Sequence, residues 1–183
     1  MKLSSPRFPL GSTIKLKVAD SDKGVDEKVA IIKQLIYDSD FTPEVRELAC
    51  ALTENISPSN DLAMIQRIYD FLQDRMVYRR DIAGVDVFIA PHRQIKSLRD
   101  YGYAYGDCDD FTAFGGALLR ALGFRVRPVV TSTMNATSDE FNHIFLQVYS
   151  PSLNKWITFD ATKKGRPLGT TARYKRIKIY SEL

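Results

Sequence analysis

A cysteine at the start of a predicted helix is the residue of this sequence best suited to nucleophilic chemistry. Cys108 lies within Gly106–Asp110 (GDCDD), directly before an apolar helical pattern. A thiol in the first turn of a helix faces unpaired backbone N–H groups and the positive end of the helix dipole, and both lower its pKa. Asp109 and Asp110 act in the opposite direction, because negative charge stabilises the protonated thiol. We expect the helix start to prevail and Cys108 to be a reactive nucleophile; a buried structural cysteine is the alternative.

A histidine and an aspartate can be paired with each other from the spacing of a predicted hairpin. Asn142–Tyr149 and Lys155–Asp160 alternate like two strands joined by a turn. Paired residues in an antiparallel hairpin have a constant sum of positions, so a turn centred near residue 152 pairs His143 with residue 160 or 161. A carboxylate beside an imidazole fixes its tautomer and stabilises the imidazolium, as a general base requires. His143 and Asp160 are therefore predicted to act together; a core histidine with satisfied hydrogen bonds is the alternative.

The other cysteine and histidine carry weaker signals. Cys50 lies inside a predicted helix beside its apolar stripe, which predicts an inert core thiol. His92 follows Pro91 and is expected at the surface or at a helix start. The cysteines and histidines are too far apart in sequence for a metal-ligand pattern, and Asp20–Gly24 lacks the glycine and glutamate positions of a calcium loop. We expect no metal site and no cofactor.

The chain that positions these residues has helical patterns first and strand patterns last. Apolar stripes with helical spacing cover residues 25–36, 43–56, 65–76 and 108–122, and period-two patterns cover residues 13–18, 124–131, 142–149, 155–160 and 176–180. Residues 78–107 show no clear period. This order predicts an α+β fold in which the helix that begins at Cys108 packs on a C-terminal antiparallel sheet.

Composition and charge limit the classes of protein that fit. The chain has 183 residues, of which 44% are hydrophobic and 26% charged, as in one soluble domain spanning residues 1–183. Residues 1–25 read as an N-terminal arm or strand and residues 163–183 as a basic C-terminal segment. No signal peptide or membrane span is recognised, so a cytoplasmic location and no membrane partner are expected.

The positive charge is concentrated near the C-terminus. Lys163–Lys178 contains seven basic residues and no acidic one, within a chain whose net charge is +4. This stretch is either a solvated face or a contact for an acidic partner. No aromatic–basic motif accompanies it, so nucleic acid is not an expected partner.

Together these motifs resemble the transglutaminase-like superfamily, most of all its small bacterial and phage-borne members. The similar blocks are GDCDD around Cys108, the helix ending LLRALGF, the Asn142-His143 pair and WITFDAT around Asp160. The resemblance implies a papain-like fold and acyl transfer from amides by a Cys-His-Asp triad. It assigns Cys108 as the nucleophile, His143 as the base and Asp160 as the orienting acid.

One departure from the family concerns the oxyanion donor. Many relatives carry a polar residue just ahead of a proline, where this chain has Ile89-Ala90-Pro91. The side-chain donor is therefore expected elsewhere, with Gln94, Tyr103 and Tyr105 as candidates, beside the backbone N–H of Cys108. Trp156, on the predicted His143 face, is expected in the core or in a groove wall.

Two functions from different classes follow. The first is a cysteine-dependent enzyme that hydrolyses a peptide or amide bond of a protein or peptide substrate through a thioester. Transglutaminase activity is an alternative outcome of the same chemistry, but the short chain lacks flanking domains to build a dry amine tunnel. The second function is a catalytically silent module with a structural or adaptor role, for example in a phage particle.

Overall fold

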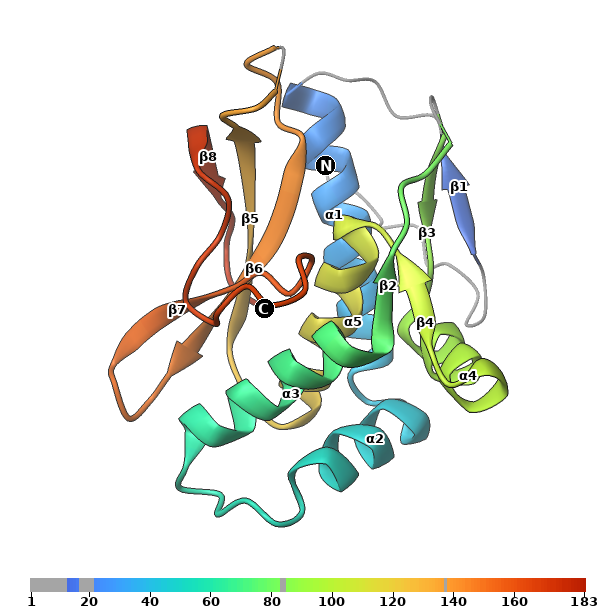
Figure 1. Ribbon diagram of the computed structural model, residues 1–183, viewed down its shortest axis with the longest axis vertical. Helices are drawn as coiled ribbons and strands as arrows, with labels where there is room; N and C mark the ends of the chain where they lie inside the picture. Colours follow the sequence, from blue (N-terminus) through green and yellow to red (C-terminus); the bar gives the residue numbers. More distant parts are fainter. Residues whose placement is uncertain (1–12, 17–21, 83–84, 137) are drawn as a thin grey trace, which may run out of the picture.

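Five helices and eight strands make up the computed structural model of the chain, which describes residues 13–16, 22–82, 85–136 and 138–183 (Figure 1). The helices are α1 (Asp22–Ser39), α2 (Pro43–Thr53), α3 (Asp61–Arg75), α4 (Pro91–Tyr101) and α5 (Cys108–Ala121). The strands are β1 (Ile14–Leu16), β2 (Met76–Tyr78), β3 (Asp86–Phe88), β4 (Ala104–Gly106), β5 (Val126–Thr133), β6 (His143–Ser150), β7 (Lys155–Phe159) and β8 (Tyr174–Ile179). Residues 1–12 of the predicted arm, the end of its predicted strand and the first two residues of Asp20–Gly24 lie outside the described residues.

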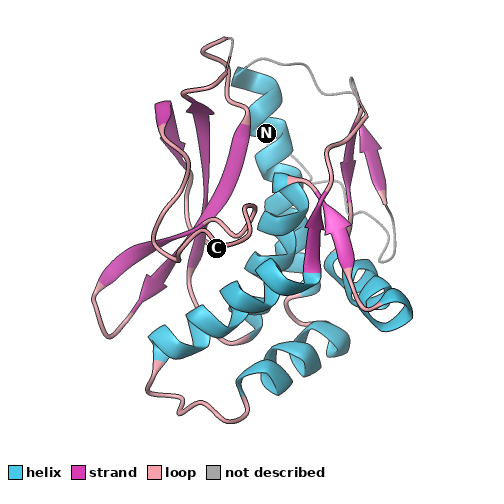
Figure 2. Ribbon diagram, viewed as in Figure 1, coloured by secondary structure: helices cyan, strands magenta, loops and turns pink. Residues whose placement is uncertain are grey.

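The predicted α+β architecture is confirmed. The C-terminal strands form a four-stranded antiparallel sheet in the order β7-β6-β5-β8. Helix α5 packs against this sheet, and α1, α2 and α3 pack around α5 (Figures 1 and 2). None of the helices in the described ranges is long and apolar enough to cross a membrane.

Helix α5 is the centre of the core. Every residue from Asp110 to Leu119 is buried. Gly116 allows close packing, because a Cβ atom there would lie 2.6 Å from Ile36 Cδ1 of α1. A helix enclosed on all sides cannot rotate or shift, so the position of Cys108 at its first turn is fixed by the core.

The segment without a clear period contains a helix and three short strands. Helix α4 begins at Pro91, and its buried residues include only one large apolar side chain, Ile95, beside the polar Gln94. Strands β2 and β4 form a parallel pair that places Tyr78 opposite Gly106. Three-residue strands and a mostly polar helix leave no periodic apolar pattern, which is why the sequence does not predict them.

Candidate active site

The GDCDD motif forms the start of α5, with Cys108 as its first residue. Asp107 is the N-cap, and its side chain accepts a hydrogen bond from the Asp109 N–H (2.9 Å). The Asp110 side chain accepts one from the Asp107 N–H (3.3 Å), which completes a capping box. The Cys108 N–H donates to no described residue, so it is a free donor at the helix start.

Asp110 ties this helix start to its surroundings. Its carboxylate also accepts a hydrogen bond from the Ile89 N–H (2.7 Å). Residue 106 must be glycine, because a Cβ atom there would lie 2.2 Å from the Asp110 carboxylate. Burial raises the pKa of Asp110 to about 9, although the two N–H donors oppose the rise.

The Cys108 thiol is protonated and bonded to its neighbour. Burial raises the pKa of Cys108 well above its usual range, and the charges of Asp109 and Asp107 raise it further. The Ile144 N–H approaches the sulfur and opposes this rise. The thiol donates to Asp109 Oδ1 at 3.7 Å. The expectation of a lowered pKa is therefore wrong, since a helix dipole contributes at most about 2 kcal/mol and burial with two carboxyl groups outweighs it.

The carboxyl groups beside the sulfur share its low-polarity environment. Burial and the charge of Asp107 raise the pKa of Asp109 to about 8, and burial raises that of Asp107 to about 6. Ligand atoms of Asp107, Cys108 and Asp109 lie within 4.8 Å of one another, a spacing that a cation could bridge. At neutral pH the Asp109 carboxyl is largely protonated, so the thiol faces a mostly neutral partner.

The predicted pairing of His143 with Asp160 forms, through a different register. His143 Nε2 lies 3.0 Å from Asp160 Oδ2. Strand β6 pairs with β7 so that Leu146 lies opposite Phe159; continued past the end of β7, this register puts Asp160 opposite Phe145. The imidazole and the carboxylate share a face and meet diagonally. The alternation of side chains correctly predicted that His143 and Asp160 share a face of the sheet. The assumed turn centre predicted the wrong residue opposite His143.

Three more side chains hold the Asp160 carboxylate. Arg166 forms an ion pair with it, and the hydroxyls of Thr162 and Thr171 each donate to it at 2.6 Å. Burial alone would raise the pKa of Asp160, but the bonds from His143, Thr162 and Thr171 hold it at about 2. Asp160 is therefore a fixed carboxylate whose hydrogen bonds keep the imidazole in place.

The basic C-terminal segment is largely paired within the molecule. Arg166 turns inward to Asp160. Ion pairs of Lys164 with Asp74 (3.9 Å), Lys175 with Asp139 (3.4 Å) and Lys178 with Asp26 (2.5 Å) engage three other members. The segment is not one uninterrupted basic surface, and sequence analysis did not identify Arg166 as a site residue.

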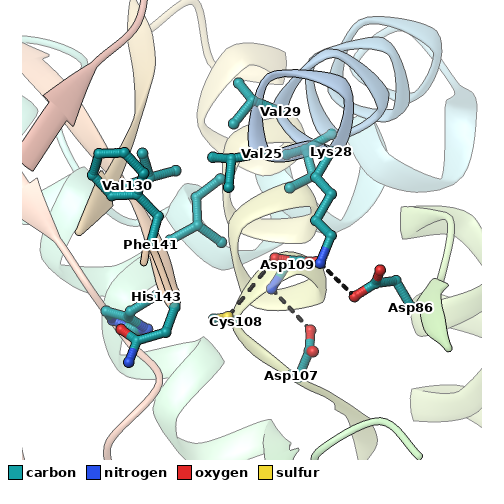
Figure 3. Close-up of a pocket in the computed structure, with 13 residues that line it drawn as sticks. Val25, Lys28, Val29, Asp86, Asp107, Cys108, Asp109, Val130, Phe141 and His143 are labelled. Atoms are coloured by element: carbon teal, nitrogen blue, oxygen red, sulfur yellow. Dashed lines mark hydrogen bonds and ion pairs between the residues drawn. The ribbon is translucent and has the colours of Figure 1, made fainter. Parts of the chain in front are cut away.

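Cys108 and His143 line the same small pocket. It has a volume of about 150 Å³ and is also lined by Lys28, Asp86 and Phe141. Figure 3 shows the sulfur at the start of α5 on the side that faces His143 of β6. Between them no hydrogen bond forms among the described residues, because the thiol bonds Asp109. Since Asp160 engages Nε2 of His143, Nδ1 is the nitrogen left to receive the thiol proton.

The structure places the four other candidate residues away from this pocket. Gln94 is buried and donates to the Tyr105 carbonyl (3.0 Å), and both residues line a separate groove. Tyr103 is exposed. Trp156 lies opposite Tyr149, six residues along β6 from His143, and stacks on Arg127. At about 3.4 Å per residue this separation excludes Trp156 from the site.

Tyr78 is a neighbour of the start of α5 that sequence analysis missed. Its backbone pairs with Gly106, and its ring packs on Phe111 of α5 with centroids 6.2 Å apart. Burial raises the pKa of Tyr78, and the charges of Cys108 and Asp107 raise it further. No periodic signal marks this residue, because it lies in a three-residue strand.

The second cysteine and the second histidine lie outside the pocket. Cys50 is exposed on α2, which corrects the prediction of a core thiol. It follows the buried Ala49 and so points away from the helix face that packs inward. His92 is the second residue of α4, as the expectation of a helix start implied.

Comparison with solved structures shows fold-level similarity. A protein from Parabacteroides distasonis described as a candidate protease is 13% identical, with a TM-score of 0.50 over 70% of this chain and 25% of that one. A candidate cysteine protease from Cytophaga hutchinsonii is 21% identical, with a TM-score of 0.45 over 84% of this chain and 53% of that one. Calcium-bound LapG from Legionella pneumophila is 16% identical, with a TM-score of 0.48 over 85% of this chain and 83% of that one. This chain thus spans about a quarter of the first protein and about half of the second.

The part of the chain that holds the candidate site matches a known protein family. A search of curated proteins finds no match. The sequence profile of the transglutaminase-like superfamily matches residues 50–161, which include Cys108, His143 and Asp160. On this match, which covers more than half of the sequence, the chain belongs to the transglutaminase-like superfamily.

Proposed function

We propose that this protein is a cysteine-dependent acyl-transfer enzyme that hydrolyses peptide or amide bonds. Its family supports a papain-like cysteine enzyme in general. The observation that carries the finer assignment is the 3.0 Å bond from His143 to the buried Asp160, in the pocket that also holds Cys108. In this proposal Cys108 is the nucleophile, His143 the general base and Asp160 the group that orients the imidazole.

The proposed reaction passes through a thioester on Cys108, with His143 as the group that moves protons. His143 Nδ1 takes the proton of Cys108 as Sγ attacks the substrate carbonyl carbon. The Cys108 N–H, which has no other described acceptor, donates to the oxyanion that forms. The imidazolium then gives its proton to the leaving amine, the C–N bond breaks and a thioester remains on Cys108. Water, deprotonated by His143, attacks the thioester and releases the acid, and the proton returns to the thiol.

The resting thiol explains why the proposed reaction needs the histidine at the moment of attack. With a raised pKa, Cys108 holds no thiolate in advance. Its bond to Asp109 must be exchanged for one to His143, which lines the same pocket. Proton transfer and attack on the carbonyl are therefore coupled.

Hydrolysis is favoured over amine transfer by the lining of the pocket. A transferase must keep water away from the thioester while an amine enters. The lining of this pocket includes the polar side chains of Lys28, Asp86, Asp107 and Asp109, and it does not form a closed apolar tunnel. An acyl group on Cys108 is thus accessible to water.

The test is incubation with a mixture of unfolded proteins and a fluorescent primary amine. We expect new peptide termini with the wild type and with Cys50→Ala, and none with Cys108→Ala. Incorporation of the amine instead would identify a transferase. Neither product, with all variants folded, would favour a non-catalytic structural or adaptor module.

A further inference from the structure

A second hollow lies beside the segment that leads into the nucleophile. Its volume is about 720 Å³, much larger than that of the Cys108 pocket. Residues of β4, of α4 and of the stretches 79–82 and 87–89 line it, including Gly106, which precedes Cys108 by two positions. We call this hollow the 79–110 groove. Its basic and aromatic lining residues are Arg79, Arg80, Arg93, Lys96, Tyr101 and Tyr105.

The groove carries positive charge that the protein does not neutralise. Neither Arg79 nor Arg80 forms an ion pair with any residue that the structure describes, and both are exposed. The Arg79 guanidinium instead stacks on the Tyr105 ring, 5.4 Å from its centroid. Basic residues outnumber acidic ones, since Asp110 is protonated at neutral pH and Asp100 pairs with Lys96. Two adjacent exposed arginines without a carboxylate partner among the described residues, one of them stacked on Tyr105, favour carboxylate ligands.

The groove is within reach of a substrate bound at Cys108. Two residues of extended chain span at most about 7 Å, so Gly106 lies within that distance of the nucleophile. A polypeptide held with its scissile carbonyl at the sulfur therefore needs only a few further residues to enter the groove.

We propose that the 79–110 groove binds an acidic segment of the polypeptide substrate, about two to four residues from the bond that Cys108 attacks. This inference rests on the proposed function and names its substrate class. A nucleic acid fits less well, because Asp81 and Asp100 interrupt the basic lining and would face an unbroken row of phosphates. A peptide can place its carboxylates on Arg79 and Arg80 and its apolar side chains on Val87 and Ile89, which also line the groove.

Fluorescence anisotropy tests this binding with a labelled peptide of alternating glutamate and alanine. All proteins carry Cys108→Ala, so that turnover cannot consume the probe. The test variant is Arg79→Glu with Arg80→Glu. The matched control is Lys163→Glu with Lys164→Glu, an adjacent exposed pair with the same change of charge in the C-terminal segment. A lysine–alanine peptide and a single-stranded oligonucleotide are the comparison probes.

We expect the acidic peptide to bind in a salt-dependent manner and the groove variant to bind it at least about tenfold more weakly. The control should stay within about twofold, and thermal unfolding should show that both variants are folded. Equal binding by the groove variant, a larger loss in the Lys163/Lys164 control or tighter binding of the oligonucleotide would each overturn the inference. Because the assay needs no catalysis, a loss of peptide binding at the groove can be distinguished from a loss of the proposed activity.

Discussion

Asp160 has four side-chain partners, of which His143 is only one. The ion pair with Arg166 is buried on the Asp160 side and nearly so on the other. A carboxylate held this way stays ionised well below its ordinary pKa, so it can hold the imidazole in one tautomer at neutral pH. Arg166, a member of the C-terminal basic segment, thus compensates the buried negative charge of Asp160.

Replacing Arg166 by Gln should therefore destabilise the fold and shift its acid sensitivity. Breaking a buried pair costs about 3 kcal/mol. In the wild type, the lowered pKa of Asp160 contributes stability above its ordinary pKa near 4, which is lost as pH falls toward about 2. In Arg166→Gln the folded-state pKa of Asp160 should rise, so this pH-dependent loss should be smaller and should end at a higher pH. Urea unfolding between pH 2 and 6 measures it, and identical pH profiles would contradict the role given to Arg166.

The two cysteines should differ in alkylation in the direction opposite to the one expected from sequence. Cys50 is exposed, whereas burial and Asp109 raise the pKa of Cys108. Iodoacetamide should therefore label Cys50 faster at neutral pH, and labelling of Cys108 should rise with pH. Peptide mass spectrometry of the wild type, Cys50→Ala and Cys108→Ala measures both rates. Faster labelling of Cys108 at pH 6 would indicate a thiolate already present in the resting enzyme.

At the scale of elements, α5 joins the chemistry to the core. Its first residue, Cys108, is the proposed nucleophile, and the helix is in contact with α1, α3 and the sheet. The GDCDD motif and the apolar stripe predicted this helix because both signals are local. The short strands β2 and β4, which flank its start, depend on pairing between residues nearly thirty positions apart and leave no local signal.

The packing of α5 on α1 can be tested at Gly116. Gly116→Ala places a methyl group 2.6 Å from Ile36 Cδ1 and should destabilise the protein by about 1–3 kcal/mol. Ile36→Val removes that Cδ1 atom, so the double variant should recover part of the loss relative to the sum of the single variants. Urea unfolding of the four proteins measures the coupling. Strict additivity would show that the two residues are not in contact.

The start of α5 should also give stability a pH dependence. The pKa of Asp110 is raised to about 9, so the folded chain retains a proton that the unfolded chain releases. Stability then falls as pH rises from about 4 to about 9, by more than about 1 kcal/mol from this group. Asp110→Asn should flatten the curve, while the exposed Asp74→Asn should not. A curve of equal slope in Asp110→Asn would contradict the raised pKa.

At the scale of the whole molecule, the site forms where the helical part meets the sheet. Cys108 comes from α5, His143 from β6 and Asp160 from just beyond β7. The GDCDD motif was enough to single out Cys108, because a motif is a local signal. The hairpin alternation was enough to single out His143 and Asp160, because it depends only on which residues share a face. Arg166, Thr171 and Tyr78 could not be selected, since their contacts with the site depend on how loops and short strands close in three dimensions. Gln94, Tyr103, Tyr105 and Trp156 were chosen by residue type and approximate position, which do not fix the direction of a side chain.

The most direct test of the triad is acylation of Cys108 by p-nitrophenyl acetate, an activated ester that needs no specific substrate recognition. The experiment uses Cys50→Ala, so that Cys108 is the only thiol in the chain. We expect an acetyl group on Cys108 by mass spectrometry and continued release of p-nitrophenol as the thioester turns over. Adding His143→Ala should lower the acylation rate by about 100-fold or more, the lower range for general base catalysis. Acylation at the same rate with and without His143 would contradict the assignment of Cys108 and His143 as nucleophile and base.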